Sequence, residues 1–578
     1  MSKAERFERP QRREPGRRST VVLWVALLVT FILCSLRFLN LRIEVNLVRD
    51  TGRATVRKKL TCNPPLPTLL AYHPPGPDAP GLKDAAVSLH EFLSIRTAAS
   101  DIDSLSIAIV TPAGPVFERG YGILRANESS AEKRGSVTRD SIYRIASITK
   151  MFTVLETLIL RERGILNWDD PVSKFIPKFA TPSYGWSDYL DGNEYTPDRS
   201  PITLRQLASH LSGIGRDYPP YDVGDAWPGP VKNGGTGNET LEELLAAIEK
   251  YPLVAPQYTF PIYSNAGVDL LGHCNLAADI SSTGKERTFA ELIKDHIFNP
   301  LGLNSSFYEV PKELAAQVAV PSADSKFADM TFSPPYNPSG GQYSSLADLA
   351  TVMKSFLSPK PIGVISPYVV REWLRPLHAW SDGSQEVGAP WEIKKIAGEA
   401  RLYAKGGNLP GYHSQFVLNP QWSYGVIVLV TGNYTDTATL ASEAISRFQP
   451  AFEKLLLMQV LYAYAGVWVG DDSVAVVTIE NEALYLQTLI IGDQDVLSLL
   501  QRNPSGESRA VALWSTGRPN EFRLGIGRYE LNDVPDAGCE PYWISLDYPH
   551  ARGAPLDLIM WDGSELVYPS AGVRLRRD

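Results

Sequence analysis

The segment YRIASITKMFTV, residues 143–154, decides the expected fold because it places a serine and a lysine inside an apolar run. The apolar positions recur at helical spacing, and Gly164 supplies the residue at which such a helix ends. Ser147 then lies at the N-terminal end of the helix, and Lys150 shares its face. Burial disfavours the charged form of an amine, so Lys150 is expected to activate Ser147. The alternative is an amphipathic surface helix with a solvated lysine.

A second polar segment, FPIYSNAGVDLLG at residues 260–272, precedes another apolar run. Its proline and polar residues predict a loop that enters a helix, with Tyr263, Ser264 and Asn265 at the junction. A tyrosine beside an ammonium group can carry protons, and an asparagine amide can orient a substrate carbonyl group. An ordinary loop is the alternative interpretation.

A third segment, YAKGGNLPGYHSQFVLNP at residues 403–420, has Lys405, Gly406 and Gly407 before a turn and a strand-like run. Glycines at such a place let a backbone approach a ligand closely and present its N–H groups. Taken alone, this pattern also fits a simple turn.

In this order, the three segments resemble the motifs of the serine β-lactamase and penicillin-binding-protein superfamily, nearest to its β-lactamase-like esterase and D-peptidase branch. The resemblance covers about residues 85–450 and implies an α+β sandwich, in which helices flank an antiparallel sheet. Further segments similar to the family follow in family order: SIAIVTPAGPVFERGYG (106–122), LNWDDPVSKFIPKF (166–179), ITLRQLASHLSGI (202–214), PLGLNSSFY (300–308) and PSGGQYSSLADLATVM (338–353).

The resemblance implies a role for each catalytic side chain. Ser147 would be the acylated nucleophile and Lys150 its immediate proton partner. Tyr263 would pass the proton to the leaving group and later assist the attack on the acyl-enzyme. Whether Lys150 or Tyr263 is the base stays open, because coupled groups share a proton.

The resemblance also implies the groups that bind substrate. Asn265 would hold the amide side of the substrate, and Lys405 would add positive charge beside Gly407. The backbone N–H groups of Ser147 and Asn408 would form an oxyanion hole. No metal ion and no cofactor are expected.

One position departs from the family pattern. Many members carry a hydroxyl residue where this chain has Gly406, and that hydroxyl helps to bind a substrate carboxylate. An ester or a neutral amide is therefore expected as substrate rather than a β-lactam. His210 lies in a context, SHLSG, that resembles a structural turn rather than a catalytic triad.

The predicted function is a serine hydrolase that acts through an acyl-enzyme on a small ester, amide, β-lactam or D-peptide. Two alternatives stay open: transfer of the acyl group to an alcohol or amine, and a binding protein that retains the fold without catalysis. A net charge of −8 and a pI near 5.7 give no support to nucleic-acid binding. The sequence does not indicate an oligomeric state.

The N-terminus predicts a membrane location. The run STVVLWVALLVTFILCSL, residues 19–36, is uncharged and long enough for a marginal span. An uncleaved signal anchor over residues 19–39, after a basic cytoplasmic tail over residues 1–18, is preferred to a cleaved signal peptide with secretion. The catalytic part is expected in the secretory lumen or outside the cell, because glycosylation sequons begin at Asn127, Asn238, Asn304 and Asn433.

The rest of the chain is divided into a linker over residues 40–84, a catalytic domain over 85–450 and a β domain over 451–578. The proline-rich part of the linker, residues 62–81, is expected to be extended. Loops at 181–201 and 215–235 are rich in aromatic residues and are expected to border the site. Cys62 and Cys539 either form a disulfide, or both remain buried thiols like Cys274.

The final 130 residues or so change in character. Residues 450–466 predict a short helix, and residues 473–491 predict two strands around a Glu-Asn-Glu turn. Further hairpins are expected at 509–526 and 556–577. Strands at this spacing predict a small antiparallel barrel or sandwich, and the region resembles the C-terminal module of fungal β-lactamase-like proteins.

Overall fold

The structure is a computed structural model that describes residues 62–182, 184, 200–218, 240–328, 332–396, 400–502, 508–527, 538–546 and 548–578. It divides into two compact units, residues 1–62 with 527–545 and residues 63–526 with 546–578. The predicted anchor at 19–39, the tail before it and most of the two aromatic loops lie outside the described residues. Within the described residues, no helix has the length and apolar character needed to cross a membrane.

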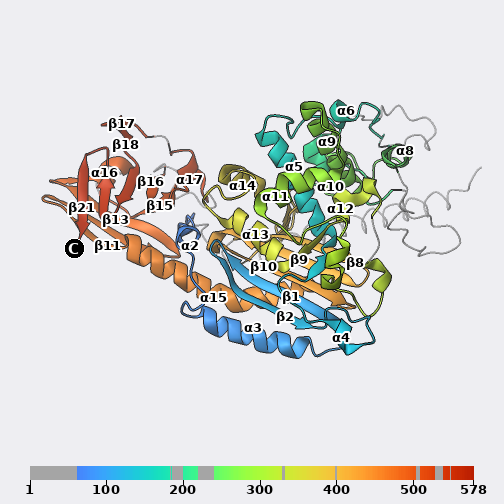
Figure 1. The fold of residues 1–578 in the computed structure, drawn as a ribbon. Coiled ribbons are helices and arrows are strands. Elements are labelled where there is room, and N and C mark those ends of the chain that lie inside the picture. Colours follow the sequence, from blue (N-terminus) through green and yellow to red (C-terminus); the bar gives the residue numbers. More distant parts are fainter. Residues whose placement is uncertain are drawn as a thin grey trace, which may run out of the picture. The chain divides into compact units, whose positions relative to one another are not determined.

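The larger unit contains an antiparallel sheet of 8 strands in the order β2-β1-β10-β9-β8-β7-β6-β5 (Figure 1). In β1, Ile107 and Ile109 belong to one apolar cluster, whereas Ala108 and Val110 belong to another. Successive side chains of a strand point to opposite faces, so the sheet is buried on both faces. The strands are β1 (Ile102–Thr111), β2 (Gly114–Gly122), β5 (His378–Ala379), β6 (Gln385–Val387), β7 (Glu392–Lys395), β8 (Arg401–Leu409), β9 (Tyr412–Asn419) and β10 (Tyr424–Gly432).

Helices cover both faces of this sheet. On one face lie α3 (Leu82–Arg96) and α15 (Thr437–Tyr464), which pack in the same cluster as Ile107. On the other face lie α5 (Thr149–Glu162), α9 (Asn265–Thr283) and α13 (Leu346–Leu357). The predicted α+β sandwich is therefore confirmed. Shorter helices complete it: α4 (Ala131–Arg134), α6 (Val172–Phe175), α7 (Leu204–Ala208), α8 (Leu241–Lys250), α10 (Phe289–Ile293), α11 (Asn299–Leu301), α12 (Asn337–Gly340) and α14 (Pro367–Trp373).

Helix α5 begins as the 143–154 segment predicts. A single 3-10 turn, η1 (Ala146–Ile148), contains Ser147 and leads directly into the helix. At the other end, Gly164 takes a φ of 75°, a left-handed conformation that glycine adopts without steric cost. The serine and the lysine are thus fixed at one end of a helix whose apolar residues lie in the core.

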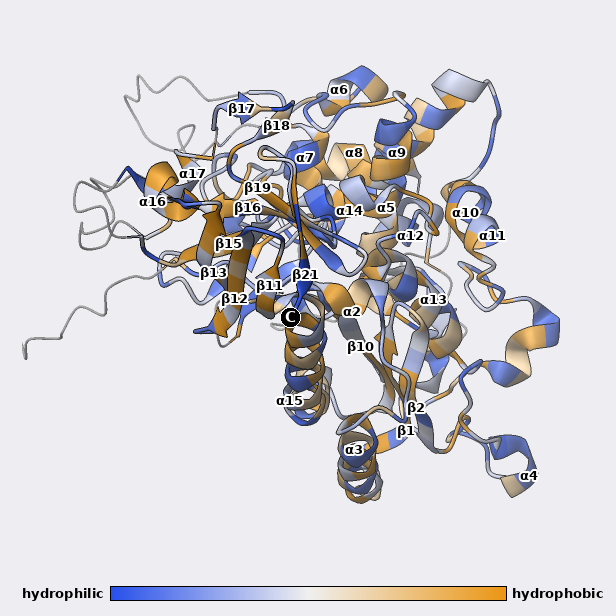
Figure 2. Ribbon diagram, turned by 90° about the vertical axis from the view of Figure 1, so that its left-hand side faces the viewer, coloured by the Kyte–Doolittle hydropathy of each residue, from blue (hydrophilic) through white to orange (hydrophobic). Residues whose placement is uncertain are grey.

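The C-terminal residues form a closed antiparallel barrel, as one of the two predicted architectures requires. The sheet order is β12-β11-β21-β20-β19-β16-β15-β13-β14, and pairing of β12 with β13 closes it. Its strands carry strongly hydrophobic stretches (Figure 2). Asn481 and Glu482 both take positive φ in the predicted hairpin turn. The strands are β11 (Gly466–Val469), β12 (Ser473–Glu480), β13 (Ala483–Ile491), β14 (Gln494–Asp495), β15 (Val511–Ser515), β16 (Glu521–Gly525), β19 (Leu558–Asp562), β20 (Glu565–Tyr568) and β21 (Val573–Arg577).

Helix α15 differs from the short helix that residues 450–466 predict. It starts at Thr437, where Asp436 accepts a hydrogen bond from the Thr439 N–H at 3.0 Å, and continues through Pro450. Proline removes the bond to the carbonyl group four residues earlier. That carbonyl belongs to Ser446, which is exposed like Pro450, so water can satisfy it. Apolar contacts on the opposite side of the helix hold it together.

The proline-rich part of the linker, residues 62–81, is also less extended than predicted, because Leu69–Tyr72 form the short helix α2. Leu69 and Leu70 are buried in the cluster that contains α15. In the smaller unit, Cys62 and Cys539 form a disulfide, which resolves the alternative left open by the sequence. Cys274 is a buried free thiol on α9.

Candidate active site

Ser147 and Lys150 lie side by side at the start of α5. The Lys150 ammonium group donates to Ser147 Oγ at 3.1 Å and to the Ser339 carbonyl oxygen at 2.6 Å. Lys150 is fully buried, whereas Ser147 keeps some exposed surface. Burial lowers the pKa of Lys150, and the nearby charge of Lys405 lowers it further. The geometry gives an accessible hydroxyl group beside an amine that loses its proton more readily than a solvent-exposed lysine.

Tyr263 lies between the two lysines, immediately before α9. The ammonium groups of Lys150 and Lys405 each lie 5.1 Å from the centre of its ring. Burial pushes the pKa of Tyr263 upward, but the two lysine charges and a hydrogen bond with Ser147 outweigh it and lower the pKa to about 8. A phenol with this pKa can both accept and donate a proton near neutral pH.

His210 supports this phenol rather than the serine. Its ring stacks on the Tyr263 ring with centroids 4.6 Å apart, and its Nδ1 accepts the Ser264 N–H at 3.1 Å. Burial and the charges of Lys150 and Lys405 hold the pKa of His210 well below its usual range. The residue is therefore a neutral imidazole in a turn with φ of 62°, in agreement with the predicted structural turn.

A buried acid that the sequence did not single out, Asp269, stands behind Lys150. Its Oδ1 accepts the Ser339 N–H at 2.9 Å, and the carbonyl oxygen of the same Ser339 accepts from Lys150. Burial raises the pKa of Asp269 to about 8. Asp269 thereby holds the backbone of Ser339, whose carbonyl oxygen orients the lysine. An acid inside the apolar run of α9 is the signal that could have revealed it.

The glycine pair of β8 brings this strand against the serine. A Cβ atom at Gly407 would lie 2.3 Å from the Ile145 carbonyl oxygen and 2.9 Å from the Ser147 nitrogen. Only glycine permits this approach of two backbones. The strand and the nucleophile are thus in direct backbone contact.

The same strand presents a backbone donor at an open edge. The Gly406 N–H points to the Glu392 carboxylate at 3.4 Å, on the side away from β9. N–H directions alternate along a strand, so the Asn408 N–H points to that side as well. The pairing of β7 with β8 ends at Ala404, so β7 does not take up this donor. This geometry is compatible with the predicted oxyanion role of Asn408.

Lys405, expected to add positive charge to the wall of the pocket, is buried. Its ammonium group donates to Glu392 Oε1 at 2.5 Å and to the Gly406 carbonyl oxygen at 2.9 Å. Burial lowers its pKa, but Glu392 and Tyr263 outweigh this effect, so the pKa of Lys405 is raised. Lys405 stays a cation, and its charge is balanced by a carboxylate that sequence analysis missed.

Asn265 begins α9 next to Tyr263, and its side chain is already engaged. The amide Nδ2 donates to Asp217 Oδ1 at 2.7 Å, which uses one of its two amide hydrogens. The Asn408 side chain is likewise engaged, because its Oδ1 lies 2.8 Å from His413 Nδ1. The structure therefore gathers Ser147, Lys150, Tyr263 and Lys405 closely and places Asn265 at their border.

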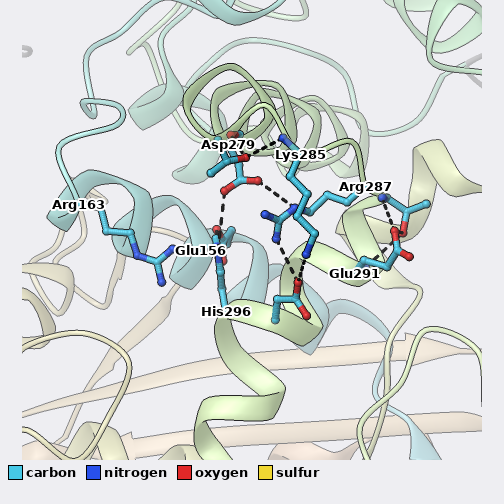
Figure 3. Close-up of polar contacts among 10 residues, drawn as sticks. Glu156, Arg163, Asp279, Lys285, Arg287, Glu291 and His296 are labelled. Carbon is cyan, nitrogen blue, oxygen red and sulfur yellow. Dashed lines mark hydrogen bonds and ion pairs between the residues drawn. The ribbon is translucent and has the colours of Figure 1, made fainter.

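A second polar cluster braces α5 farther along its length (Figure 3). The buried Glu156 accepts from His296 Nδ1 at 2.8 Å, and Arg163 donates to His296 Nε2 at 2.9 Å. Asp279 of α9 pairs with Arg287 at 3.1 Å, and both side chains are almost fully buried. These charges connect α5 to α9 and to the turn of π-helix at Lys294–Phe298. They fix the helix that carries Ser147 and Lys150.

Two other features lie outside this site. A surface cavity of about 630 Å³ between α3 and β2 is lined by residues such as His90 and Glu118, and it contains none of the site residues. Within the described ranges, no group of three or more His, Cys, Asp or Glu side chains is arranged to hold a metal ion.

Comparison of the sequence with known proteins identifies one family. The sequence model of the family described as Beta-lactamase matches residues 91–447. The beta-lactamase-like protein str5 of Strobilurus tenacellus is 42% identical over 229 residues, which cover 38% of this chain and 80% of that protein. The beta-lactamase-like protein str6 of the same fungus is 35% identical, with coverage of 50% and 97%. A beta-lactamase/D-alanine carboxypeptidase structure from Yersinia pestis has 21% identity and a TM-score of 0.49, covering 65% of this chain and 98% of its own.

Proposed function

Because the chain belongs to the beta-lactamase family, we propose that it is a serine hydrolase that cleaves small esters or amides through an acyl-enzyme. The observation that carries the proposal is the contact of Lys150 Nζ with Ser147 Oγ at 3.1 Å, beside a phenol with a pKa of about 8. A surface helix would leave the lysine solvated, whereas Lys150 is fully buried. Within the described residues, the hydrogen bonds of its ammonium group go to Ser147 Oγ and the Ser339 carbonyl oxygen, not to a carboxylate. Burial of an amine in this way is costly and is typical of a catalytic lysine.

The proposed acylation follows from these contacts. The proton of Ser147 passes to the Lys150–Tyr263 pair as Oγ attacks the substrate carbonyl carbon. The N–H groups of Ser147 and Asn408 stabilise the oxyanion, and such donors contribute roughly 3 to 4 kcal/mol each in other enzymes. When the tetrahedral intermediate collapses, the pair returns its proton to the leaving alcohol or amine through Tyr263.

Deacylation reverses the roles. The Lys150–Tyr263 pair takes a proton from water as the water oxygen attacks the ester carbonyl of the acyl-enzyme. Collapse of the second intermediate returns a proton to Ser147 Oγ and releases the acid. An alcohol or amine that replaces water would give acyl transfer by the same steps.

Labelling of the purified protein tests the proposal. A fluorophosphonate probe should label the wild type and not Ser147→Ala, and a fluorescent penicillin should label it weakly or not at all, because the site has Gly406 and Glu392 beside Lys405. Product analysis with an added alcohol would separate hydrolysis from transfer. Absence of fluorophosphonate labelling in a folded wild type would favour a binding protein instead.

We also propose that the described part of the chain lies in the secretory lumen or outside the cell. Three of the predicted sequon asparagines, Asn127, Asn304 and Asn433, are exposed, and Asn238 lies outside the described residues. The disulfide of Cys62 with Cys539 supports an oxidising compartment. A mobility shift after enzymatic removal of N-glycans, absent when all four sequon asparagines are replaced by glutamine, is the expected result.

A further inference from the structure

The two charges at the end of β7 and β8 differ sharply in exposure. Lys405 and Glu392 form an ion pair, but the side chain of Lys405 is 1% exposed and that of Glu392 is 47% exposed. A molecule that approaches from solvent therefore meets the carboxylate and not the ammonium group. The side of the site formed by these strands is electrostatically negative or neutral, although a lysine lies behind it.

The carboxylate is also held in place. Its Oε1 accepts from Lys405, and its Oε2 lies 3.4 Å from the Gly406 N–H. Gly406 adds no side chain that could cover it, and a Cβ atom at that position would lie 3.8 Å from Oε2. Glu392 is therefore a fixed and accessible negative charge at the border of the reacting groups.

We propose that Glu392 determines substrate specificity: it repels substrates whose acyl chain carries a carboxylate a few bonds from the reacting carbonyl group and favours those with a cationic or neutral group there. This inference rests on the proposed hydrolase function. The physical reason is that like charges a few ångströms apart repel strongly when they are partly shielded from water. A cation at that place would instead pair with Glu392.

Arg216 is a further cation near the site, and it affects how the test must be designed. The Arg216 guanidinium lies 4.8 Å from the centre of the Tyr263 ring, and its side chain is 61% exposed. Asp217 balances it at 3.5 Å. Arg216 influences the absolute preference for charged substrates, so the test measures the change that a substitution of Glu392 causes in relative rates.

The experiment uses three p-nitrophenyl esters of acids with similar length. Glutarate carries a free carboxylate, 4-(trimethylammonio)butyrate carries a cation, and 5,5-dimethylhexanoate is neutral. Values of kcat/KM are measured for the wild type, for Glu392→Gln and for Glu372→Gln. Glu372 is a matched control because it lies on α14, outside the site, is 38% exposed and also forms an ion pair, with Arg161.

In Glu392→Gln, the ratio of kcat/KM for the anionic to the neutral ester should rise about tenfold or more, and the ratio for the cationic to the neutral ester should fall by a similar factor. Glu372→Gln should leave both ratios unchanged. A purely structural defect would lower all three rates together, and that result would overturn the proposal, as would unchanged ratios. If the wild type hydrolyses none of the esters, or if Ser147→Ala retains the activity, the hydrolase function fails and this inference fails with it.

Discussion

The glycine pair of β8 allows a sharp test of the oxyanion geometry, because the two neighbours differ in what a methyl group would meet. At Gly407 an added Cβ lies 2.3 Å from the Ile145 carbonyl oxygen and 2.9 Å from the Ser147 nitrogen. Both atoms are backbone atoms and cannot turn away. At Gly406 the nearest atom is the Gln415 Oε1, 3.0 Å away at the end of a flexible side chain.

The expected magnitude follows from these distances. Ordinary contacts begin near 3.4 Å, so Gly407→Ala must separate β8 from the Ser147 turn by about 1 Å. A displacement of that size in reacting groups costs about 100-fold in rate, and removal of an oxyanion donor costs about 100- to 1,000-fold. We therefore expect kcat to fall by about 100-fold or more. Added strain in a packed site costs about 1–3 kcal/mol of stability, so the variant should still fold.

The assay compares initial rates of hydrolysis of p-nitrophenyl acetate for Gly407→Ala, Gly406→Ala and the wild type, each normalised to the fraction folded in a thermal melt. Gly406→Ala should stay close to the wild type. The reasoning is refuted if folded Gly407→Ala keeps a kcat similar to that of Gly406→Ala, because close backbone contact would then have no role in catalysis.

Three further outcomes are expected. The pH profile of kcat/KM should rise with an inflection near pH 8, because Tyr263 loses its proton there. Tyr263→Phe should abolish that inflection, and an unchanged profile in the variant would exclude Tyr263 as its source. The pKa of Asp269 is raised by folding, so its stabilising contribution is complete at low pH and is lost as pH rises from about 4 to about 8. Asp269→Asn should lack this loss, and its melting temperature relative to the wild type should increase over that pH range; a constant difference contradicts the assignment. Phe452→Ala, at a fully buried position of α15, should lower the free energy of unfolding by about 3–5 kcal/mol, whereas Lys454→Ala on the exposed side should change it by less than about 0.5 kcal/mol in urea titrations.

Local patterns predicted those parts of the site that depend on short spacing. Ser147 and Lys150 are three residues apart on one helical turn, and the structure places their polar atoms 3.1 Å apart. The hairpin turn at Asn481 and Glu482 was likewise predicted, because a polar Glu-Asn-Glu stretch separates two strand-like runs. In both cases the residues that fix the geometry are close together in the sequence.

Groups brought together by sheet register or by distant packing were not predicted. Glu392 reaches Lys405 because β7 and β8 pair with Glu392 opposite Ala404, and no local pattern encodes that register. The full length of α15 was missed because Pro450 is typical of a helix start. Only burial of the opposite side of that helix explains why it continues through the proline.

The continuous α15 has a practical consequence for anyone who wishes to express part of this protein. Truncation at residue 450 would cut the helix between Phe448 and Phe452, both of which are fully buried in a cluster shared by the sheet and the barrel. The end of the shortened helix would expose apolar surface, which favours aggregation. A soluble recombinant fragment should therefore retain the helix to Tyr464 together with the barrel that follows it.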